Sequence, residues 1–387
     1  MNKIYMDNAA TTRITQPVLE AMMPYLTGCY GNPSSVYETG REARKAIEKA
    51  RQQTAEALGA QPGEIYFTGC GTESDNWALR GAAYARRDKG KHIITSAIEH
   101  HAVLHTAQQL EKEGFQVTYL PVDGEGLVDP AELEKAMRPD TTLVSVMMAN
   151  NEIGTLQPIE ELGRIAKAHG ALMHTDAVQA IGSVPINLAA LPVDLLSLSG
   201  HKFHAPKGVG ALYIRKGASI GRFMLGGAQE RGQRAGTENL ASIVGLGAAI
   251  QLAAENLPRH NAYLTQLRDA MIDGIMERIP HVRLNGHPRK RLPGNVNVSV
   301  RYLEGESMLL NLDLRGIAAS SGSACTSGSL DPSHVLLAIG LPHEIAHGSL
   351  RFSLSEDNTL EEVEQVTAEL EKIVARLRAM SPLYHGE

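Results

Sequence analysis

The chain has 387 residues, of which 43% are hydrophobic, so it is long enough for two domains with sizeable cores. A formal net charge of −6, with the charged residues dispersed, argues against nucleic acid as the main partner. We expect no membrane-spanning segment, because no uninterrupted apolar run reaches about 18 residues, and the odd number of three cysteines favours a reducing cytoplasm over a disulfide framework.

In the middle of the chain, short apolar stretches alternate with longer helical ones, which is typical of parallel βαβ units. Strands are predicted near 65–67, 92–96, 117–120, 143–148, 171–175, 194–198 and 209–214. Helices are expected between them, as at 73–87 and 159–169. We predict an α/β fold over residues 15–255, with a mostly parallel seven-stranded sheet flanked by helices.

The last third of the chain has a different order of predicted helices and strands. A helix is predicted near 262–278, an alternating strand at 295–300, a further strand at 349–353 and a closing helix at 360–380. Thr359 with Glu362 forms a capping box for that last helix. We expect residues 1–14 and 256–387 to form a smaller α+β domain.

Polar segments follow five of the predicted strands. In open parallel sheets the ligand site lies at the carboxyl ends of the strands, so these segments are expected on one rim. They are 69–72, 99–101, 150–152, 176–179 and 199–202.

The first of these segments, Gly69-Cys70-Gly71-Thr72, joins a strand to a helix. The N–H groups of a helix start bind anions, Gly71 permits close approach and Thr72 adds a hydroxyl, so a phosphate site is predicted. Ser199 and His201 are candidates for further donors. The alternative is an ordinary strand-to-helix turn, and the third glycine of a dinucleotide fingerprint is missing.

Lys202 and Asp176 each follow an apolar strand on this rim. Lysine is rarely buried without a partner or a task, and its desolvated amine can form Schiff bases. Pyridoxal phosphate requires such a lysine together with an acid beside its pyridinium nitrogen, so the pair predicts this cofactor. For either residue alone, a salt bridge at the sheet edge is the alternative.

Two more side chains suit the same cofactor. Gln179, one helical turn beyond Asp176, can bond the ring hydroxyl. His100 directly follows a strand, where an imidazole can stack on the ring and carry protons. We rank His100 above the nearby His101 and His105, because it comes first after the strand.

Cys325 lies at the centre of the small, polar segment 320–329. This composition cannot pack a core, so the thiol is predicted to be exposed and mobile. An exposed thiol is an oxidation liability unless it has a task. The alternative is an incidental surface cysteine.

The segment His343-Glu344-Ile345-Ala346-His347 matches the His-Glu-x-x-His pattern of zinc peptidases. It is confined between Pro342 and Gly348, under two helical turns, so we expect no metal. Arg351, in the strand that follows, can clamp a substrate carboxylate through two parallel hydrogen bonds, the alternative being a structural ion pair.

These residues belong to longer motifs, and through them the chain resembles the class I (NifS/IscS-type) cysteine desulfurases, pyridoxal phosphate enzymes of fold type I. The resemblance extends nearly from end to end. Its motifs are 5–12, 31–35, 72–76, 150–154, 174–179, 199–202, 229–239, the Ser-Gly-Ser-Ala-Cys loop ending at Cys325, and 350–354.

The resemblance implies a role for each candidate residue. Lys202 would form the imine with the coenzyme, and Cys325 would accept sulfur as a persulfide, able to ligate an iron–sulfur cluster transiently. Thr237 would reach the phosphate of the other subunit, which makes the enzyme a homodimer. The remaining contacts are Asp176 to the pyridinium, Gln179 to the ring hydroxyl, His100 stacked on the ring, Thr72, Ser199 and His201 to the phosphate, and Asn32, Asn151 and Arg351 to the substrate carboxylate, with Asn151 also near the cofactor.

The implied reaction converts L-cysteine to L-alanine. Sulfur would pass through Cys325 to an iron–sulfur scaffold or another acceptor protein, in the cytoplasm. A selenocysteine lyase, an aminotransferase and a non-catalytic sulfur-carrier or partner-binding subunit remain alternatives. The residues after the lysine, Phe203-His204-Ala205, depart from many members, and we expect them to affect the pocket and leave the chemistry unchanged.

Overall fold

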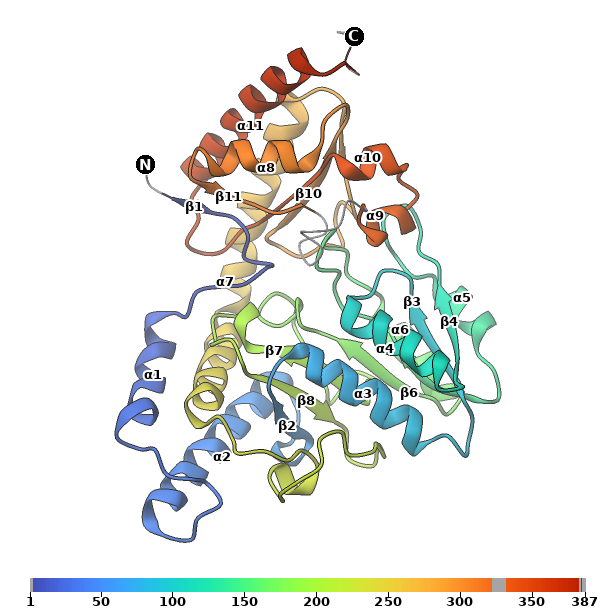
Figure 1. Cartoon of the computed structure of the whole chain (residues 1–387), viewed down its shortest axis with the longest axis vertical. Coiled ribbons are helices and arrows are strands. Elements are labelled where there is room, and N and C mark those ends of the chain that lie inside the picture. Colours follow the sequence, from blue (N-terminus) through green and yellow to red (C-terminus); the bar gives the residue numbers. More distant parts are fainter. Residues whose placement is uncertain (1–2, 322–331, 383, 385–387) are drawn as a thin grey trace.

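The structure, a computed structural model, describes residues 3–321, 332–382 and 384. Figure 1 shows a larger body and a smaller body joined by the long helix α7 (Leu240–Arg278). Both ends of the chain lie at the smaller body, so the first residues cross from it to the larger body. This crossing segment passes between the two bodies and contributes to the site described below.

The larger body is built on a seven-stranded sheet with the order β2-β8-β7-β6-β5-β3-β4. Strand β8 is antiparallel to both of its neighbours, and every other neighbouring pair is parallel. The mostly parallel sheet predicted from the sequence is confirmed. Its strands are β2 (Ile65–Thr68), β3 (His92–Ser96), β4 (Gln116–Leu120), β5 (Thr141–Ser145), β6 (Leu172–Asp176), β7 (Leu195–Ser199) and β8 (Gly210–Ile214).

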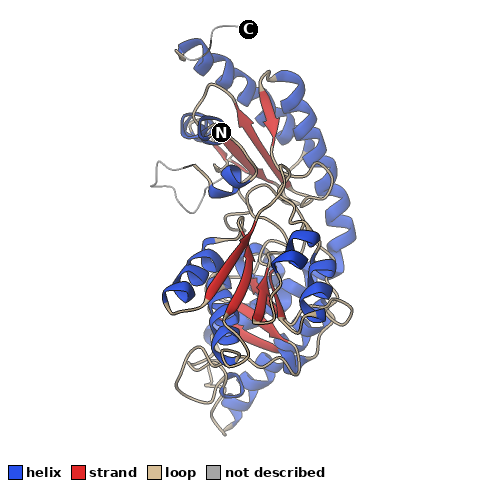
Figure 2. Ribbon diagram, turned by 90° about the vertical axis from the view of Figure 1, so that its right-hand side faces the viewer, coloured by secondary structure: helices blue, strands red, loops and turns tan. Residues whose placement is uncertain are grey.

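Helices cover both faces of this sheet, as Figure 2 shows. Successive strand residues point to opposite faces, so Ile93 packs in one core cluster with Trp77 of α3, whereas Ile94 packs in the other with Ile47 of α2. A sheet buried on both faces accounts for the nearly continuous apolar strands. The helices are α1 (Gln16–Thr27), α2 (Glu38–Leu58), α3 (Gly71–Ala85), α4 (His101–Lys112), α5 (Pro130–Ala136) and α6 (Ile159–Ala168).

The smaller body has its own core, in which Met6 packs with Leu267 and Phe352. Its antiparallel sheet has the order β12-β10-β9, and the short β1 pairs with β11. The predicted capping box is confirmed, because Thr359 and Glu362 accept each other's backbone N–H. The elements are β1 (Ile4–Tyr5), β9 (Val282–Leu284), β10 (Asn295–Val300), α8 (Gly305–Asp313), β11 (Ile317–Ala318), α9 (His334–Ala338), α10 (His343–His347), β12 (Ser349–Ser353) and α11 (Leu360–Met380).

Helix α7 differs from its prediction in length, because it begins at Leu240 and continues through Pro258. The expected domain boundary at residue 255 therefore falls inside one helix, and the limits 15–255, 1–14 and 256–387 stay a prediction. An 18-residue window of α7 has a mean hydropathy of 1.4, enough by length and composition for a membrane span, and half of that window is buried. This window is not an uninterrupted apolar run, so the expectation of no membrane-spanning segment stays a prediction. Within the described residues α7 packs against α1, α2 and α11, as a core helix does.

Candidate functional site

A cavity of about 340 Å³ lies at the carboxyl ends of the parallel strands. It gathers residues from the ends of β2, β3, β5, β6 and β7, as the common rim predicted, and adds residues from the N-terminal segment and β12. The predicted site residues that line it are Gly71, Thr72, His100, Asn151, Asp176, Gln179, Ser199, His201, Lys202 and Arg351.

One wall of the cavity is the first turn of α3, which begins at Gly71. The leading N–H groups of a helix lack intrahelical acceptors, and the helix dipole favours an anion there. A Cβ atom at Gly71 would lie 2.7 Å from Cγ2 of Val178 and 3.2 Å from Cβ of Ser199, so only glycine leaves this cradle open. The arrangement suits a phosphate group.

Lys202 and Asp176 reach the cavity from neighbouring parallel strands. Lys202, in the short 3-10 turn η2 (Gly200–Lys202) after β7, donates from Nζ to the carbonyl oxygens of Ala9 at 2.6 Å and Ala10 at 2.9 Å. Oδ1 of Asp176 accepts the N–H of Val178 at 2.8 Å. Burial raises the pKa of Asp176 to about 6, against the opposing effects of that hydrogen bond and of the Lys202 charge.

Two further buried acids lie close to Asp176, and neither was a predicted site residue. Asp75 lines the cavity, and among the described residues its Oδ1 has no hydrogen-bond partner. Burial and the Asp176 charge raise the pKa of Asp75 well above its usual range, while burial raises the pKa of Glu99 to about 8. Both shifts favour the protonated forms of these two acids.

His174 separates this acid cluster from the sheet interior. Its Nδ1 lies 2.8 Å from Oγ of Ser145, and its Nε2 lies 3.0 Å from Oγ of Ser197 and 3.7 Å from Oδ1 of Asp75. Burial lowers the pKa of His174 to about 3, so the ring is neutral and does not neutralise Asp75. The spacing of Gly71 and Asp75, one helical turn apart on α3, was the sequence signal that could have placed Asp75 at the site.

His100 precedes α4 as its N-cap, and its Nδ1 accepts the N–H of Ala102 at 3.1 Å. This hydrogen bond assigns the proton of the neutral ring to Nε2. Burial lowers the pKa of His100 to about 4, and the Lys202 charge adds to the effect. His101 is stacked on His105 and lies against His334, with ring centroids 4.9 Å apart in each pair, so the histidine at this wall of the cavity is His100.

Arg351 is only 1% exposed and makes the structural ion pair that was the alternative to its predicted role. It forms an ion pair with Asp7, NH2 to Oδ1 at 2.9 Å, and donates from NH1 to the carbonyl of Asn151 at 3.0 Å. Its Nε has no hydrogen-bond partner within the described part of the chain. Asp7 lies in the N-terminal motif 5–12 and was not itself a predicted site residue. It pairs with a residue 344 positions away, so no local sequence pattern could have predicted the contact.

Gln179 and His201 also contact the N-terminal segment. Nε2 of Gln179 donates to the carbonyl of Ala9 at 2.9 Å, and Nδ1 of His201 lies 3.2 Å from Oγ1 of Thr11. Burial, followed by the Lys202 charge, lowers the pKa of His201 to about 4, so this ring is neutral at pH 7. The hydrogen bonds that these residues could give to a ligand are partly made with residues 9–11 instead.

Three predicted site residues are not brought into the cavity. Asn32 is exposed and its Oδ1 accepts the N–H of Ser34 at 2.9 Å. Thr237 is also exposed and lies outside the cavity lining. Cys325 lies outside the described residues, so its predicted exposure is not addressed.

Both ends of the segment that carries Cys325 are attached at the cavity. Ser320 exchanges backbone hydrogen bonds with Arg351, at 2.7 and 3.1 Å. Beyond the segment, Ser333 donates to the buried Glu152 carboxyl group and Nε2 of His334 donates to the carbonyl of Glu99 at 2.9 Å. The described residues before and after this segment therefore bond to residues at or beside the site.

The His-Glu-x-x-His segment forms only the five-residue helix α10. Its two imidazoles, from His343 and His347, pack edge to face with centroids 4.6 Å apart. The described residues contain no cluster of histidine, cysteine and acidic side chains that could hold a metal ion. The zinc alternative thus lacks a third ligand in this part of the chain.

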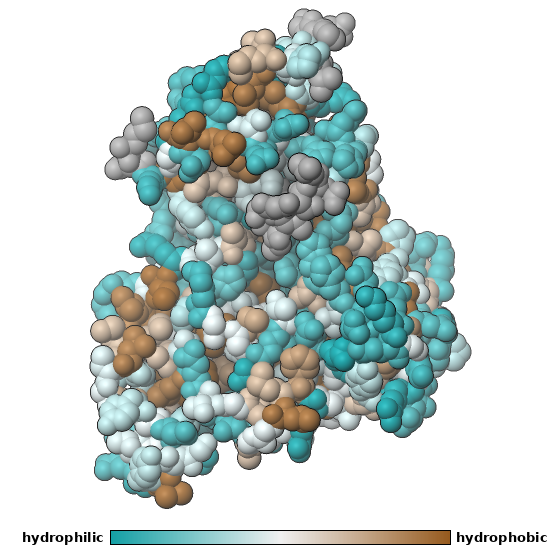
Figure 3. Space-filling view, in the orientation of Figure 1, coloured by the Kyte–Doolittle hydropathy of each residue, from teal (hydrophilic) through white to brown (hydrophobic). Residues whose placement is uncertain are grey.

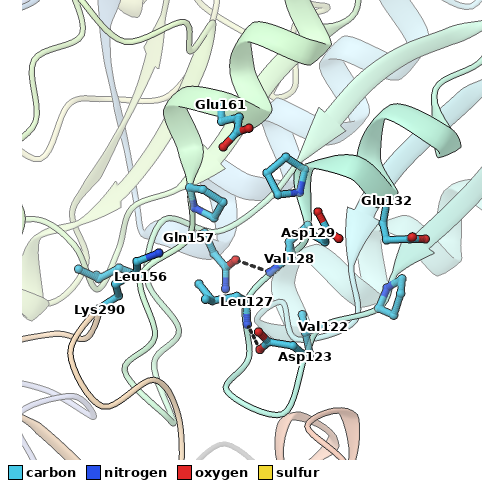
Figure 4. Close-up of a pocket in the computed structure, with 13 residues that line it drawn as sticks. Val122, Asp123, Leu127, Val128, Asp129, Glu132, Leu156, Gln157, Glu161 and Lys290 are labelled. Carbon is cyan, nitrogen blue, oxygen red and sulfur yellow. Dashed lines mark hydrogen bonds between the residues drawn. The ribbon is translucent and has the colours of Figure 1, made fainter.

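A larger hollow, of about 700 Å³, lies away from the strand ends, between the β4–α5 connection and the start of α6 (Figure 4). Its polar groups serve the local backbone. Asp123 accepts the N–H groups of Glu125 and Leu127, Asp129 accepts that of Ala131, and Gln157 accepts that of Val128. We therefore assign the chemistry to the smaller cavity.

Comparisons with known proteins show the family to which the chain belongs. The family model for class V aminotransferases matches residues 4–366. The chain is 60% identical over 380 residues to cysteine desulfurase IscS of Methanosarcina thermophila, covering 98% of this chain and 94% of the relative. Among solved structures it is similar to a NifS-like protein, with a TM-score of 0.92, 42% identity and coverage of 97% and 100% of the two chains. It is also similar to SspA in complex with cysteine, with a TM-score of 0.81, 38% identity and coverage of 92% and 99%.

Proposed function

Because the chain belongs to the class V aminotransferase family and, within it, to the cysteine desulfurases, we propose that it uses pyridoxal phosphate, held in the strand-end cavity, to take sulfur from L-cysteine onto Cys325. The observation that carries this proposal is the convergence of Lys202, Asp176 and the Gly71 cradle on one cavity. An amine, an acid and an anion site are the three groups that this coenzyme requires of a protein.

The cavity residues fit the coenzyme group by group. Gly71 and Thr72, at the start of α3, face the position of the phosphate, and Ser199 and His201 lie on the same lining. Asp176 would sit at the pyridinium nitrogen, Gln179 at the ring hydroxyl and His100 over the ring face. When bound, the coenzyme supplies an electron sink that lets the Cα–H bond of the substrate ionise.

Lys202 has two tasks in this reaction. It would hold the coenzyme, and its amine, when free, would take the Cα proton of the substrate. In the structure Nζ is 2.6 Å from the Ala9 carbonyl, which aims the amine across the cavity. Because the amine is already held in place, it does not have to be ordered during the reaction.

The protonated states of Asp75 and Glu99 favour this chemistry. Three acids share one buried region, and ionising more than one would set like charges against each other. The raised pKa values of Asp75 and Glu99 favour placing the negative charge on Asp176, where it would stabilise a protonated pyridinium. The three acids would thus place their negative charge on Asp176, the acid that contacts the ring in this proposal.

Arg351 would bind the substrate carboxylate, with Asn151 beside it. Its unpartnered Nε and its NH2 together form one edge of the guanidinium, the geometry that matches a carboxylate. Asp7 occupies NH2, so the substrate would share or displace that ion pair. We also propose that Asn32 contributes to this carboxylate site, although it is exposed in the single chain.

His100 is proposed to move thiol protons. With Nδ1 used by the N–H of Ala102 and its pKa lowered by burial, the neutral ring offers the Nε2 proton as a donor. It can therefore donate a hydrogen bond to a sulfur atom, and moving a proton would require the ring first to gain one. The same neutral ring can lie flat over the coenzyme without bringing a second positive charge beside Lys202.

Cys325 is the proposed sulfur acceptor. It lies five positions after Ser320, so its Cα can lie up to about 17 Å from that anchor. Attack of the Cys325 thiolate on the substrate sulfur forms the S–S bond of a persulfide and breaks the C–S bond, and the remaining three-carbon fragment becomes alanine. Sulfur is then expected to pass to an iron–sulfur scaffold or another acceptor protein, in the cytoplasm.

A homodimer would complete the site. Thr237 is exposed and outside its own cavity, which suits a contact with the phosphate in a second copy. Figure 3 shows apolar side chains gathered over α1, where Leu19, Met23 and Leu26 are exposed. Contiguous exposed apolar surface of this kind commonly marks a protein interface.

The decisive experiment compares Cys325→Ala with Cys70→Ala in the purified, coenzyme-loaded protein. Cys70 is an exposed thiol on the cavity wall, and it has no role in the proposal. We expect Cys325→Ala to keep the bound coenzyme and to form no persulfide, while Cys70→Ala forms persulfide and alanine from L-cysteine as the wild type does. Undiminished sulfide release from Cys325→Ala would refute the assignment of the nucleophile.

A further inference from the structure

His204, two residues after Lys202, has an unusual backbone conformation. Its φ is +70°, in the left-handed region that disfavours residues with a Cβ atom. Its side chain is only 19% exposed. A strained and largely enclosed residue this close to the lysine requires a compensating set of contacts.

The contacts of His204 reach two separate parts of the chain. Its backbone N–H donates to Oγ1 of Thr12 at 2.8 Å, and its Nδ1 donates to the carbonyl of Arg13 at 3.0 Å. Its Nε2 forms an ion pair with Oε1 of Glu356 in the smaller body at 3.4 Å. With an acceptor at each ring nitrogen, the geometry suits the doubly protonated imidazolium.

The segment that His204 contacts also holds the lysine amine. We call residues 7–13 the N-terminal strap. Its Ala9 and Ala10 carbonyls accept from Nζ of Lys202, and its Thr12 N–H donates to the carbonyl of His201 at 2.9 Å. On its other side the strap is bonded to the smaller body through the backbone N–H of Ala9, which donates to Oγ of Ser353 at 2.8 Å.

One side of the lysine turn borders open space, while Phe203, next to Lys202, is buried in the core. A second hollow, of about 350 Å³, is lined by Lys202, Phe203, His204 and Glu356. A turn that borders open space is held by its hydrogen bonds and ion pairs more than by contact with a filled core. The three contacts of His204 are the bonds that close this side of the turn.

We propose that His204 is a positioning residue for Lys202, which through its ion pair with Glu356 holds the N-terminal strap and thereby the carbonyls that orient the lysine amine. This inference rests on the proposed function, because it concerns the residue that would bind the coenzyme. His204 touches neither substrate nor coenzyme in this scheme.

The ion pair makes this positioning sensitive to pH. Burial alone would lower the pKa of His204, but the hydrogen bond and charge of Glu356 outweigh burial and raise it. Asp357 adds to the rise, Arg13 is itself paired with Asp357, and Lys202 and His260 also border the same hollow. Because the folded pKa lies above that of the unfolded chain, the stabilisation is fully present below pH ~6.5 and is lost as the pH rises through the folded pKa.

Two variants and one control test the proposal in the coenzyme-loaded protein. His204→Asn keeps a residue that tolerates the left-handed backbone and removes the charge, and Glu356→Gln removes the partner. His281→Asn makes the same substitution at another left-handed histidine, in the smaller body. The readouts are alanine formation from L-cysteine across pH 6–9 and the absorbance titration of the bound coenzyme.

We expect both variants to keep the coenzyme and to lower kcat/KM at pH 6.5 by about tenfold, a common size for coupling between separate sites. The wild type should lose activity as the pH rises through the His204 pKa, and this loss, with the accompanying spectral shift, should be absent from both variants. The double variant should be no worse than either single one, because the two residues act as a pair. His281→Asn should match the wild type.

Wild-type pH profiles and spectra in both variants, or additive losses in the double variant, would overturn the inference. If His204→Asn does not fold, Glu356→Gln alone decides, since it leaves the strained backbone position unchanged. The two proposals fail differently. A wild-type protein that forms no alanine from L-cysteine refutes the proposed function, whereas active wild type with unaffected variants refutes only the role of His204.

Discussion

The two hollows differ in whether their polar groups have hydrogen-bond partners, and this difference does not follow their volumes. The hollow beside α5 and α6 is about twice the size of the strand-end cavity, about 700 against about 340 Å³ (Figure 4). In the larger one, carboxylates such as Asp129 cap nearby backbone N–H groups. In the smaller one, Asp75 and Arg351 each present a buried polar atom that no other described residue satisfies.

Buried polar groups without partners cost free energy, so each calls for an explanation. Two such groups line the strand-end cavity, and none of the described residues that line the larger hollow is of this kind. The comparison predicts that substitutions in the cavity change chemistry, while those in the larger hollow change at most stability.

The largest effect is expected for Asp176→Asn. The amide keeps the size of the side chain and cannot carry the negative charge that stabilises a pyridinium, so kcat should fall by about 10²–10³-fold. Alanine formation from L-cysteine measures this loss, and Asp129→Asn in the larger hollow serves as the matched control. Equal activities of the two variants would remove the distinction between the hollows.

A smaller loss is expected for Arg351→Lys. Lysine retains the positive charge and loses the planar pair of donors that matches a carboxylate, so KM for L-cysteine should rise by about tenfold or more, with a smaller change in kcat. Steady-state kinetics separate the two parameters. An unchanged KM would show that Arg351 serves only its ion pair with Asp7.

Glu99→Gln should change stability with pH more than it changes activity. Burial raises the pKa of Glu99 to about 8 from 4.5. The unfolded chain therefore releases this proton before the folded protein does, and the wild type loses stability as the pH rises from about 4.5 to about 8. Glutamine does not ionise, so this pH-dependent loss of stability disappears. The thermal midpoint of Glu99→Gln should therefore fall less than that of the wild type between pH 5 and pH 8. Parallel curves for the two proteins would mean that Glu99 is already ionised in the folded state.

The smallest effect is expected for Asp129→Ala, in the larger hollow. Asp129 is the N-cap of α5, and losing such a cap typically costs about 1 kcal/mol of stability. Denaturant unfolding should show that decrease, with alanine formation from L-cysteine unchanged. A loss of activity beyond the loss of folded protein would show that this hollow takes part in the reaction.

Much of the rim could be predicted from the sequence because parallel strands end at one edge. Lys202, Asp176 and His100 each follow a recognisable apolar strand, so their meeting needed no knowledge of long-range packing. Local chemistry was equally informative at Gly71, where a helix begins directly after a strand. These residues were placed by patterns that extend over a few positions.

The residues that sequence reasoning did not place depend on contacts between distant segments or on burial. Asp7 and Ala9 reach the site from the N-terminal strap, and no periodic pattern predicts that a segment crosses between the two bodies. The charges of Asp75 and Glu99 are decided by desolvation, which the sequence does not display. Helix α7 was predicted too short because Pro258 resembles a helix break, while the structure accommodates it inside the helix.

The central claim, that Lys202 binds the coenzyme inside the strand-end cavity, is tested most directly by reduction with borohydride followed by peptide mass spectrometry. Reduction converts an imine to a stable secondary amine and so records which lysine carried it. The account predicts that the coenzyme is found on the peptide containing Lys202 and that Lys202→Ala shows no labelled peptide. Coenzyme attached to another lysine, or none attached in protein that converts L-cysteine to alanine, would contradict it.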